Sequence, residues 1–189
     1  MRLVQLPQSA SWTHVGVRDG FEVLFAGAGT LRGHTAGREG TSTWSVGYDI
    51  TVDRNWRTRA VEATNLTELG ARRIHLERGS AGRWLVNGLD RPDLDGCDDV
   101  DLESSAATNT LPVHRIDLAV GEAVDVASAL IRANDLTVER LDQRYTLTNV
   151  RDDGFTVFYE APRFGFDCAL EFDATGLTVD YPGIARRSS

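Results

Sequence analysis

Apolar and polar side chains alternate with a period of two along most of this chain, and that period predicts β-strands. Residues 44–53 show it without exception, since Trp, Val, Tyr, Ile and Val occupy every second position. Residues 164–172 are equally regular, with three Phe, one Cys and one Leu on one face. Shorter segments of the same kind are found at 56–63, 71–77, 113–120, 136–141, 144–150, 155–161 and 176–181.

Two segments are harder to assign. Residues 122–135 suit a short helix by their Ala, Leu and Arg content, yet their apolar residues also alternate. Because the segments on both sides are strands, we predict a strand here. Residues 27–42 hold many glycines and small polar residues, which predict a loop or a weak strand around Leu31.

Turn-forming sequences separate these segments, among them Asp53-Arg54-Asn55 and residues 151–154 and 173–176. Together these segments predict about a dozen strands at a spacing of roughly 8 to 12 residues, without a long helix. A sheet with so many strands must close, curl or split into two, and a curled sheet of this width encloses more volume than its own side chains fill. We therefore predict a mostly β fold, a meandering antiparallel sheet with a ligand cavity.

The chain has 189 residues, which suits one domain with a full hydrophobic core. We assign residues 1–185 to this β domain and expect residues 186–189 to form a disordered tail. The net charge is −8, so we expect no nucleic-acid partner. No run approaches the roughly 18 apolar residues of a membrane span, and residues 1–12 lack the apolar core of a signal peptide. These features predict a cytoplasmic protein without a transmembrane segment.

Two cysteines, Cys97 and Cys168, are too few for a disulfide framework. We expect two buried reduced thiols, with a single bridge between them as the alternative. A reactive Cys97 would need a base, and nothing in the sequence brings any of the four histidines to it. The chain also lacks the GxSxG, HExxH, phosphate-loop and dinucleotide motifs, so we predict no catalytic residue and no cofactor.

Residues 93–103 carry six carboxylates and invite a calcium interpretation. An EF-hand loop with Gly96 at its sixth position would place Arg91 and Leu102 where acidic ligands are needed, so the register fails and we predict no metal. A turn followed by a strand, with Asp99 and Asp101 facing solvent, accounts for the same pattern.

Ligand contacts are better predicted from aromatic, guanidinium and amide side chains. Aromatic faces stack on sugar rings or acyl chains, and arginine binds carboxylate, phosphate or hydroxyl groups. The alternative interpretation is that the tryptophans belong to the core and the arginines to the solvated surface. The predicted ligand-binding residues are Trp56, Arg57, Arg59, Trp84, Asn87, Asn109 and Tyr145.

The most specific motifs lie in residues 84–112. They are Trp84-Leu-Val-Asn-Gly, Leu94-Asp95-Gly96-Cys97-Asp98-Asp99-Val100-Asp101-Leu102 and Thr108-Asn109-Thr110-Leu111-Pro112. Further motifs are Tyr48 with Asp53 and Trp56-Arg57-Thr58-Arg59, Gln143 with Tyr145, and Gly176-Leu177 with Asp180-Tyr181-Pro182-Gly183. In this ordered set the sequence resembles the glycolipid-binding protein family of bacteria, over about residues 12–185.

The resemblance implies a mostly β fold in which a strongly curved, many-stranded sheet forms an open barrel, similar to bacterial envelope carriers of lipids or lipoproteins. It also implies a lipid or glycolipid-like ligand. This sequence departs from the family where His14-Val15 replaces a His-Glu pair and His114-Arg115 replaces a basic pair. The envelope carriers are exported, whereas this chain shows no export signal, so we expect lipid binding on the cytoplasmic side.

Our leading hypothesis is a non-enzymatic protein that binds an amphiphile in its cavity, with apolar strand faces on the acyl part and with Trp56, Arg57, Arg59 and Asn109 near the polar head. The alternative is a small hydrolase or transferase acting on a hydrophobic substrate, centred on Cys97 and its acidic neighbours. A third hypothesis is a protein-interaction module, which an exposed sheet edge or apolar patch would support.

Overall fold

The computed structural model describes residues 3–103 and 105–188, and most of them lie in one β-sheet. Helical structure is limited to α1 (Thr110–Arg115) and to 3₁₀ turns at Pro92–Leu94, Ala107–Asn109 and Pro162–Phe164. The strands are β1 (Ser9–His14), β2 (Asp19–Gly27), β3 (Thr30–Glu39), β4 (Ser42–Val52), β5 (Thr58–Thr67), β6 (Gly70–Arg78), β7 (Trp84–Val86), β8 (Leu89–Asp90), β9 (Asp99–Leu102), β10 (Ala123–Ile131), β11 (Val138–Arg151), β12 (Gly154–Ala161), β13 (Phe166–Asp173), β14 (Thr178–Tyr181) and β15 (Ala185–Arg187).

The sheet consists of two meanders joined in the middle. Its strand order is β8-β7-β6-β5-β4-β3-β2-β1-β15-β14-β13-β12-β11-β10-β9. The first and last strands of the chain make the junction, where Trp12 pairs with Arg187 and His14 with Ala185. All neighbours are antiparallel except β9 and β10, which run parallel. The predicted mostly β fold, a strongly curved sheet that does not close, is confirmed.

The sheet curls so that β9, the strand at one of its edges, contacts the start of β5 in the other half of the sheet. The Val100 amide donates to the Thr58 hydroxyl over 3.0 Å, and the Thr58 amide donates to the Asp98 carbonyl over 3.0 Å. This contact satisfies polar groups that an unpaired edge strand would otherwise expose. The edge strand β9 thus covers one side of the curled sheet, although the sheet does not form a continuous barrel.

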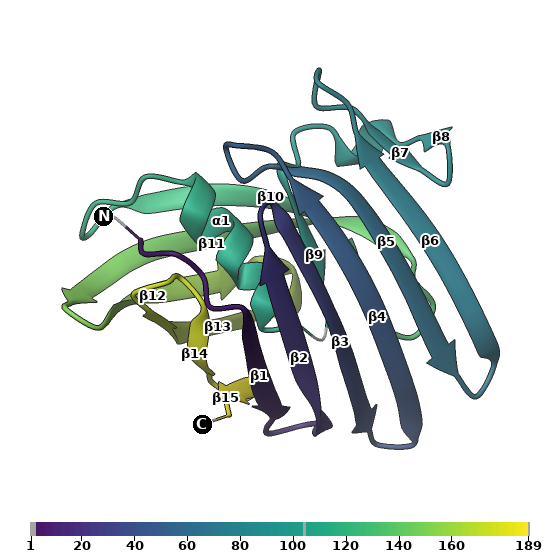
Figure 1. Cartoon of the computed structure of the whole chain (residues 1–189), viewed down its shortest axis with the longest axis horizontal. Coiled ribbons are helices and arrows are strands. Elements are labelled where there is room, and N and C mark those ends of the chain that lie inside the picture. The colour runs from purple at the N-terminus through teal and green to yellow at the C-terminus, as the bar shows by residue number, and fades with distance from the viewer. Residues whose placement is uncertain (1–2, 104, 189) are drawn as a thin grey trace.

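Residues 105–116, named here the internal segment, fill much of the space inside the curl. Figure 1 shows α1 of this segment lying between β1–β2 and the strands that precede the C-terminus. Thr110 donates to the Gly176 carbonyl over 3.0 Å, and Thr178 donates to the Ala106 carbonyl over 3.0 Å. The cavity predicted from the strand count is therefore largely occupied by the chain itself, and smaller spaces remain at the two ends of the strands.

Residues 27–42, predicted to form a loop or a weak strand around Leu31, contain the whole of strand β3. Two of its glycines face aromatic residues directly across the pair with β4, Gly33 opposite Tyr48 and Gly37 opposite Trp44. A methyl group at either glycine would collide with the aromatic ring. The rings cover the glycines and supply the packing that these positions lack, a pairing known to stabilise glycine in strands.

Three further predictions from the sequence can be compared with these strands and helices. Residues 122–135 contain β10, so the predicted strand there is confirmed. Residues 113–120 were expected to form a strand, but their first part belongs to α1, where Pro112 lies in the first helical turn and its missing amide hydrogen is not needed. Arg186 and Arg187 pair within the sheet, so strand structure extends beyond the predicted boundary at residue 185, while residue 189 lies outside the described residues.

Candidate functional site

A groove of about 560 Å³ opens where the β2–β3 and β4–β5 turns meet the N-terminal segment. We name it the Trp56 groove. Its wall is formed by Leu3, Val4 and Leu6 from the N-terminal segment, by Leu31 and Val52 from β3 and β4, and by Trp56 and His114. Its volume lies in the range of roughly 300 to 1,000 Å³ that suits one small ligand.

The turn between β4 and β5 holds Trp56 in place. The Asp53 carboxylate accepts hydrogen bonds from the amides of Asn55 and Arg57, over 2.8 and 3.0 Å. Trp56 itself has a φ of +63°, a left-handed conformation that is unfavourable for a bulky residue. The predicted Asp-Arg-Asn turn therefore forms, and it presents the indole at the groove.

His114 stacks on Trp56, with ring centroids 3.8 Å apart and planes 22° from parallel. Its Nε2 donates to the Thr175 carbonyl over 2.8 Å, which fixes the position of the ring. Burial lowers the pKa of His114, so the imidazole is neutral at pH 7. The aromatic pair is an uncharged wall of the groove.

Arg57 and Arg115, which directly follow Trp56 and His114 in the chain, belong to a cluster of three arginines and two aspartates, the arginine–aspartate cluster. Arg57 and Arg78 reach Asp98 over 3.1 and 2.5 Å, and Arg115 reaches Asp99 over 2.6 Å and Asp98 over 3.5 Å. Asp99 is fully buried, so the prediction that it faces solvent is wrong. Its place beside the guanidinium of Arg115 explains how a buried carboxylate is tolerated. The cluster carries one positive charge in excess.

The other predicted ligand residues lie elsewhere. Arg59 is exposed in a separate pocket with Arg83 and Asp90, and Asn87 accepts the His75 amide over 2.9 Å. Their ligand-binding role stays a prediction.

Three of the predicted residues are buried and hydrogen-bonded within the fold. The Trp84 indole donates to the Cys97 carbonyl over 2.9 Å. The Tyr145 hydroxyl donates to the Asn109 side chain over 2.9 Å, beneath the internal segment. Trp84, Asn109 and Tyr145 line neither the Trp56 groove nor the cavity described next, and their ligand-binding role stays a prediction.

A second space of about 440 Å³, the aromatic cavity, opens at the opposite end of the strands. Sequence reasoning missed it, because its residues come from seven separate parts of the chain. Its apolar wall includes Leu130, Leu141, Tyr159, Phe164, Phe166, Tyr181 and Ile184. Its polar lining comes from Arg18, Glu39, Asp101, Glu103 and Arg132.

Asp101 forms the polar floor of the aromatic cavity. Thr108 donates to one of its carboxylate oxygens over 2.8 Å and Gln143 to the other over 2.9 Å. Gln143 is itself fixed, because it also donates to the Tyr159 hydroxyl over 2.8 Å and accepts from Ser128 over 2.9 Å. Burial raises the pKa of Asp101 to about 6, and its hydrogen bonds offset only part of that rise.

Glu22, also missed from the sequence, anchors the internal segment to β2. Its fully buried carboxyl accepts four hydrogen bonds, from the hydroxyls of Tyr48 and Ser105 over 2.7 and 2.5 Å and from the amides of Ala106 and Ala107 over 2.7 and 3.3 Å. Burial nevertheless raises its pKa to about 7. The signal in the sequence was one Glu within an otherwise apolar strand.

With this geometry established, comparison with known proteins identifies the family. A family model described as "Putative glycolipid-binding" matches residues 10–187. The chain belongs to this family. A crystal structure of a DUF1089-family protein from Pseudomonas aeruginosa is similar to this member of the glycolipid-binding family, with a TM-score of 0.80 and 28% identity over 100% of this chain and 97% of the other. No protein of curated function matches the sequence.

Several motifs that carry the family resemblance are structural in this member of the glycolipid-binding family. Gly96 has a φ of +85° and allows the tight turn in which the Cys97 carbonyl accepts from both Trp84 and Arg78. Residues 108–112 are buried where the 3₁₀ turn Ala107–Asn109 leads into α1. The motif around Gly96 therefore fixes the loop that covers β9, and the Thr-Asn-Thr-Leu-Pro motif shapes the internal segment.

The thiols of this glycolipid-binding family member are poor nucleophiles. Cys97 and Cys168 are both buried and free, as predicted. Burial raises the pKa of the Cys97 thiol to about 11, which disfavours the thiolate at neutral pH. Nor does Cys97 line the Trp56 groove or the aromatic cavity.

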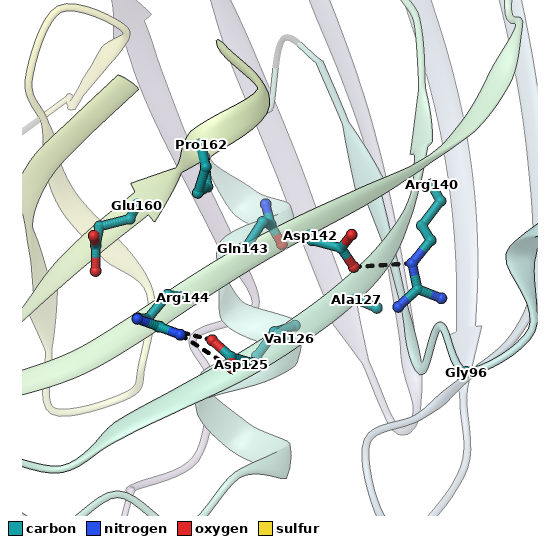
Figure 2. Close-up of a pocket in the computed structure, with 10 residues that line it drawn as sticks. All are labelled: Gly96, Asp125, Val126, Ala127, Arg140, Asp142, Gln143, Arg144, Glu160 and Pro162. Atoms are coloured by element: carbon teal, nitrogen blue, oxygen red, sulfur yellow. Dashed lines mark hydrogen bonds and ion pairs between the residues drawn. The ribbon is translucent and has the colours of Figure 1, made fainter. Parts of the chain in front are cut away.

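A third pocket, of about 520 Å³, lies on the outer face of β10, β11 and β12 (Figure 2). Figure 2 shows that its charged residues pair with one another, Arg140 with Asp142 and Arg144 with Asp125, over 2.9 and 2.7 Å. Exposed pairs of this kind contribute little binding energy, and their partners already occupy the guanidinium groups. This pocket is a weaker candidate than the other two.

No helix in residues 3–103 and 105–188 has the length and apolar character needed to cross a bilayer.

Proposed function

We propose that this protein binds a lipid or glycolipid-like amphiphile without chemical conversion, with the apolar part in the Trp56 groove and the polar head at Arg57. The observation that carries this proposal is an uncharged groove lined by Trp56 and His114, which directly precede Arg57 and Arg115 of a cluster with excess positive charge. The name of the family, which refers to glycolipids, supports the same class of ligand.

The groove suits an acyl chain because its lining is neutral. Among the described residues that line it there is no Asp, Glu, Lys or Arg, and its histidine, His114, is uncharged at pH 7. Leu3, Val4 and Leu6 contribute apolar side chains to the same lining as Trp56. Burying an acyl chain there would gain roughly 0.8 kcal/mol for each methylene removed from water.

The polar head would meet the arginine–aspartate cluster. Arg57 directly follows Trp56 in the chain, and its side chain is 39% exposed, against 10% for Arg78 and 13% for Arg115. Arg57 is therefore the guanidinium most able to bind an acidic or hydroxylated head group. The cytoplasmic location expected from the sequence stays a prediction.

Fluorescence quenching tests the groove directly, because the chain has four tryptophans and three of them are almost completely buried. A lysolipid with a brominated acyl chain should quench Trp56 on binding, since bromine must come close to the indole. Trp12, Trp44 and Trp84 should remain emissive. The Trp56→Phe variant should lose the quenching while keeping its circular dichroism spectrum.

The head-group contact is tested by the same titration. Arg57→Ala should weaken the binding of an anionic lysolipid by about two- to fivefold, as expected for a partly exposed charge. Arg151→Ala, which removes an arginine from the β11–β12 turn, is the matched control and should leave the affinity unchanged. Native mass spectrometry that finds no bound or titratable lipid, together with absent quenching, would contradict the proposal.

A further inference from the structure

We propose that the aromatic cavity is a second binding site, independent of the Trp56 groove, and that it takes a small organic cation whose ammonium group pairs with Asp101. The two spaces lie at opposite ends of the strands. The cavity includes Val17 and Glu39 at the β1–β2 and β3–β4 turns, and the groove includes Gly29 and Val52 at the β2–β3 and β4–β5 turns. At about 3.3 Å per residue, a strand such as β2 separates them by about 30 Å.

The charge of Asp101 is the first observation. Within residues 3–103 and 105–188, no Lys, Arg or His forms an ion pair with its carboxylate, and its side-chain donors, Thr108 and Gln143, are neutral. A half-buried carboxylate in this state gains more from a bound cation than a solvated one would, because the surroundings screen the attraction less.

The neighbouring charges already satisfy one another. In the lining of the cavity, Arg18 pairs with Glu39 over 3.0 Å and Arg132 pairs with Glu103 over 2.8 Å. The lining therefore contains three carboxylates and two guanidinium groups, and Asp101 accounts for the excess. An anionic ligand would lie beside the Asp101 carboxylate and be repelled by it. An anion is therefore the least suitable ligand for this cavity.

Aromatic rings beside this carboxylate are the second observation. Tyr159, Phe166 and Tyr181 line the same cavity with their centroids 6.0 to 6.3 Å apart. Aromatic faces attract cations through their quadrupoles, and ammonium ligands are commonly bound between such rings. Burial and the negative charge of Asp101 both raise the pKa values of Tyr159 and Tyr181, so these hydroxyls stay protonated and Asp101 is the anion.

The inner surface is also held in shape before a ligand arrives. Gln143 bridges Asp101 to the Tyr159 hydroxyl, and Ser128 holds the other end of the Gln143 amide. Arg132 lies over the Phe164 ring at 5.7 Å, which keeps that ring at the entrance. A site ordered in this way loses little conformational freedom on binding.

Two isosteric probes test the inference by calorimetry. Choline carries a quaternary ammonium, and 3,3-dimethylbutan-1-ol has the same shape without the charge. We expect choline to bind at least about tenfold more tightly than the alcohol. Asp101→Asn should remove that preference, whereas Asp142→Asn, on the exposed face of β11, should keep it.

The pH dependence of choline binding in the unaltered protein provides a second measurement, which needs no variant to fold. Affinity should fall as the pH drops through about 6, where Asp101 takes up a proton. The other charged or titratable groups facing the site are Arg18, Glu39, Asp99, Glu103, Arg132, Tyr159 and Tyr181. Among these described carboxylates, Glu39, Asp99 and Glu103 have arginine partners and Asp101 has none, so we assign the loss near pH 6 to Asp101.

Several results would overturn the inference: equal affinity for the two probes, no choline binding at millimolar concentration, an unchanged preference in Asp101→Asn, or binding of methyl glucoside in place of choline. The first three reject the ion pair, and the last assigns the cavity to sugar hydroxyls. Saturating the Trp56 groove with the brominated lysolipid should leave choline binding intact. Failure of either site is therefore distinguishable from failure of the other.

Discussion

Replacing Glu22 with Gln should flatten the pH dependence of the free energy of unfolding. The pKa of Glu22 is about 7 in the folded chain, against an ordinary value of 4.5, because burial outweighs its four hydrogen bonds. An acid with a raised pKa takes up a proton on folding, so its stabilising contribution is complete below pH 4.5 and is lost as the pH rises through about 7. Each pKa unit corresponds to about 1.4 kcal/mol, so the contribution lost is about 3 kcal/mol.

Urea unfolding followed by circular dichroism at several pH values between about 4.5 and 8 measures this effect. The quantity to compare is the difference in free energy of unfolding between the wild type and Glu22→Gln, because other titrating groups such as Asp101 and His75 contribute to both. Over this interval the wild type should lose about 3 kcal/mol relative to the variant. Glu68→Gln, at an exposed glutamate in the β5–β6 turn, is the control and should follow the wild type.

Parallel curves for the wild type and Glu22→Gln would refute the reasoning, since they would show that Glu22 does not titrate in this interval. A wild type that gains stability relative to the variant as the pH rises would refute it more strongly. That result would mean that the four hydrogen bonds outweigh burial and hold the carboxylate ionised. Hydrogen exchange at the Ala106 and Ala107 amides gives an independent measurement, because ionisation at the end of those bonds should change their protection.

Three further predictions concern stability and are checked by urea unfolding at neutral pH. Arg115→Ala should cost about 3 to 5 kcal/mol, because it leaves the buried Asp99 carboxylate without its guanidinium; Asp99→Asn in the same chain should recover part of that loss. Gly33→Ala should cost more than about 1 kcal/mol, since the added methyl would overlap the Tyr48 ring and a backbone carbonyl of β2. Trp84→Ala should cost about 3 to 5 kcal/mol through the cavity that it leaves. A change below about 0.5 kcal/mol, typical of surface positions, would contradict any of the three.

The strands could be predicted wherever one face is buried and the other solvated. Residues 44–53 are the clearest case, because Trp44 and Ile50 point into the core while Ser45 and Thr51 point outward. Residues 122–135 were assigned correctly from their neighbours, although their composition also suited a helix. In both segments the period of two reflects local burial, which the sequence records directly.

Prediction failed where the stabilising partner lies on another strand. Gly33 and Gly37 look like loop residues until the rings of β4 cover them, and no local pattern reveals that cover. In β2 the apolar residues do not indicate which face of the strand is buried, since Glu22 points inward while Phe21 and Phe25 are more than half exposed. The four donors that make the buried Glu22 tolerable come from Tyr48 on β4, two strands away, and from the internal segment.

The candidate site was predicted in part, for the same reason. Trp56 was predicted as a ligand contact and lines the groove, while its neighbour in sequence, Arg57, pairs with Asp98. Asp99 was predicted to face solvent because its partner, Arg115, was not expected nearby. Arg115 lies in helix α1, whereas the alternating pattern of residues 113–120 predicted a strand. The aromatic cavity depends on side chains brought together from β9, β12 and β14 by the curl of the sheet, and this arrangement has no local signature.

The pairing of β1 with β15 has a consequence for how the chain folds. Each meander is built from hairpins between neighbouring segments, which form by short loop closures and hence early. The junction of Trp12 with Arg187 closes a loop of nearly the whole described chain, and it therefore carries the largest entropic cost in the sheet. We expect its formation to be the slow step, with the two halves already sheet-like and their edges at β1 and β15 still unpaired. Until that step is complete, those edges are the places where two chains are most apt to exchange strands and aggregate.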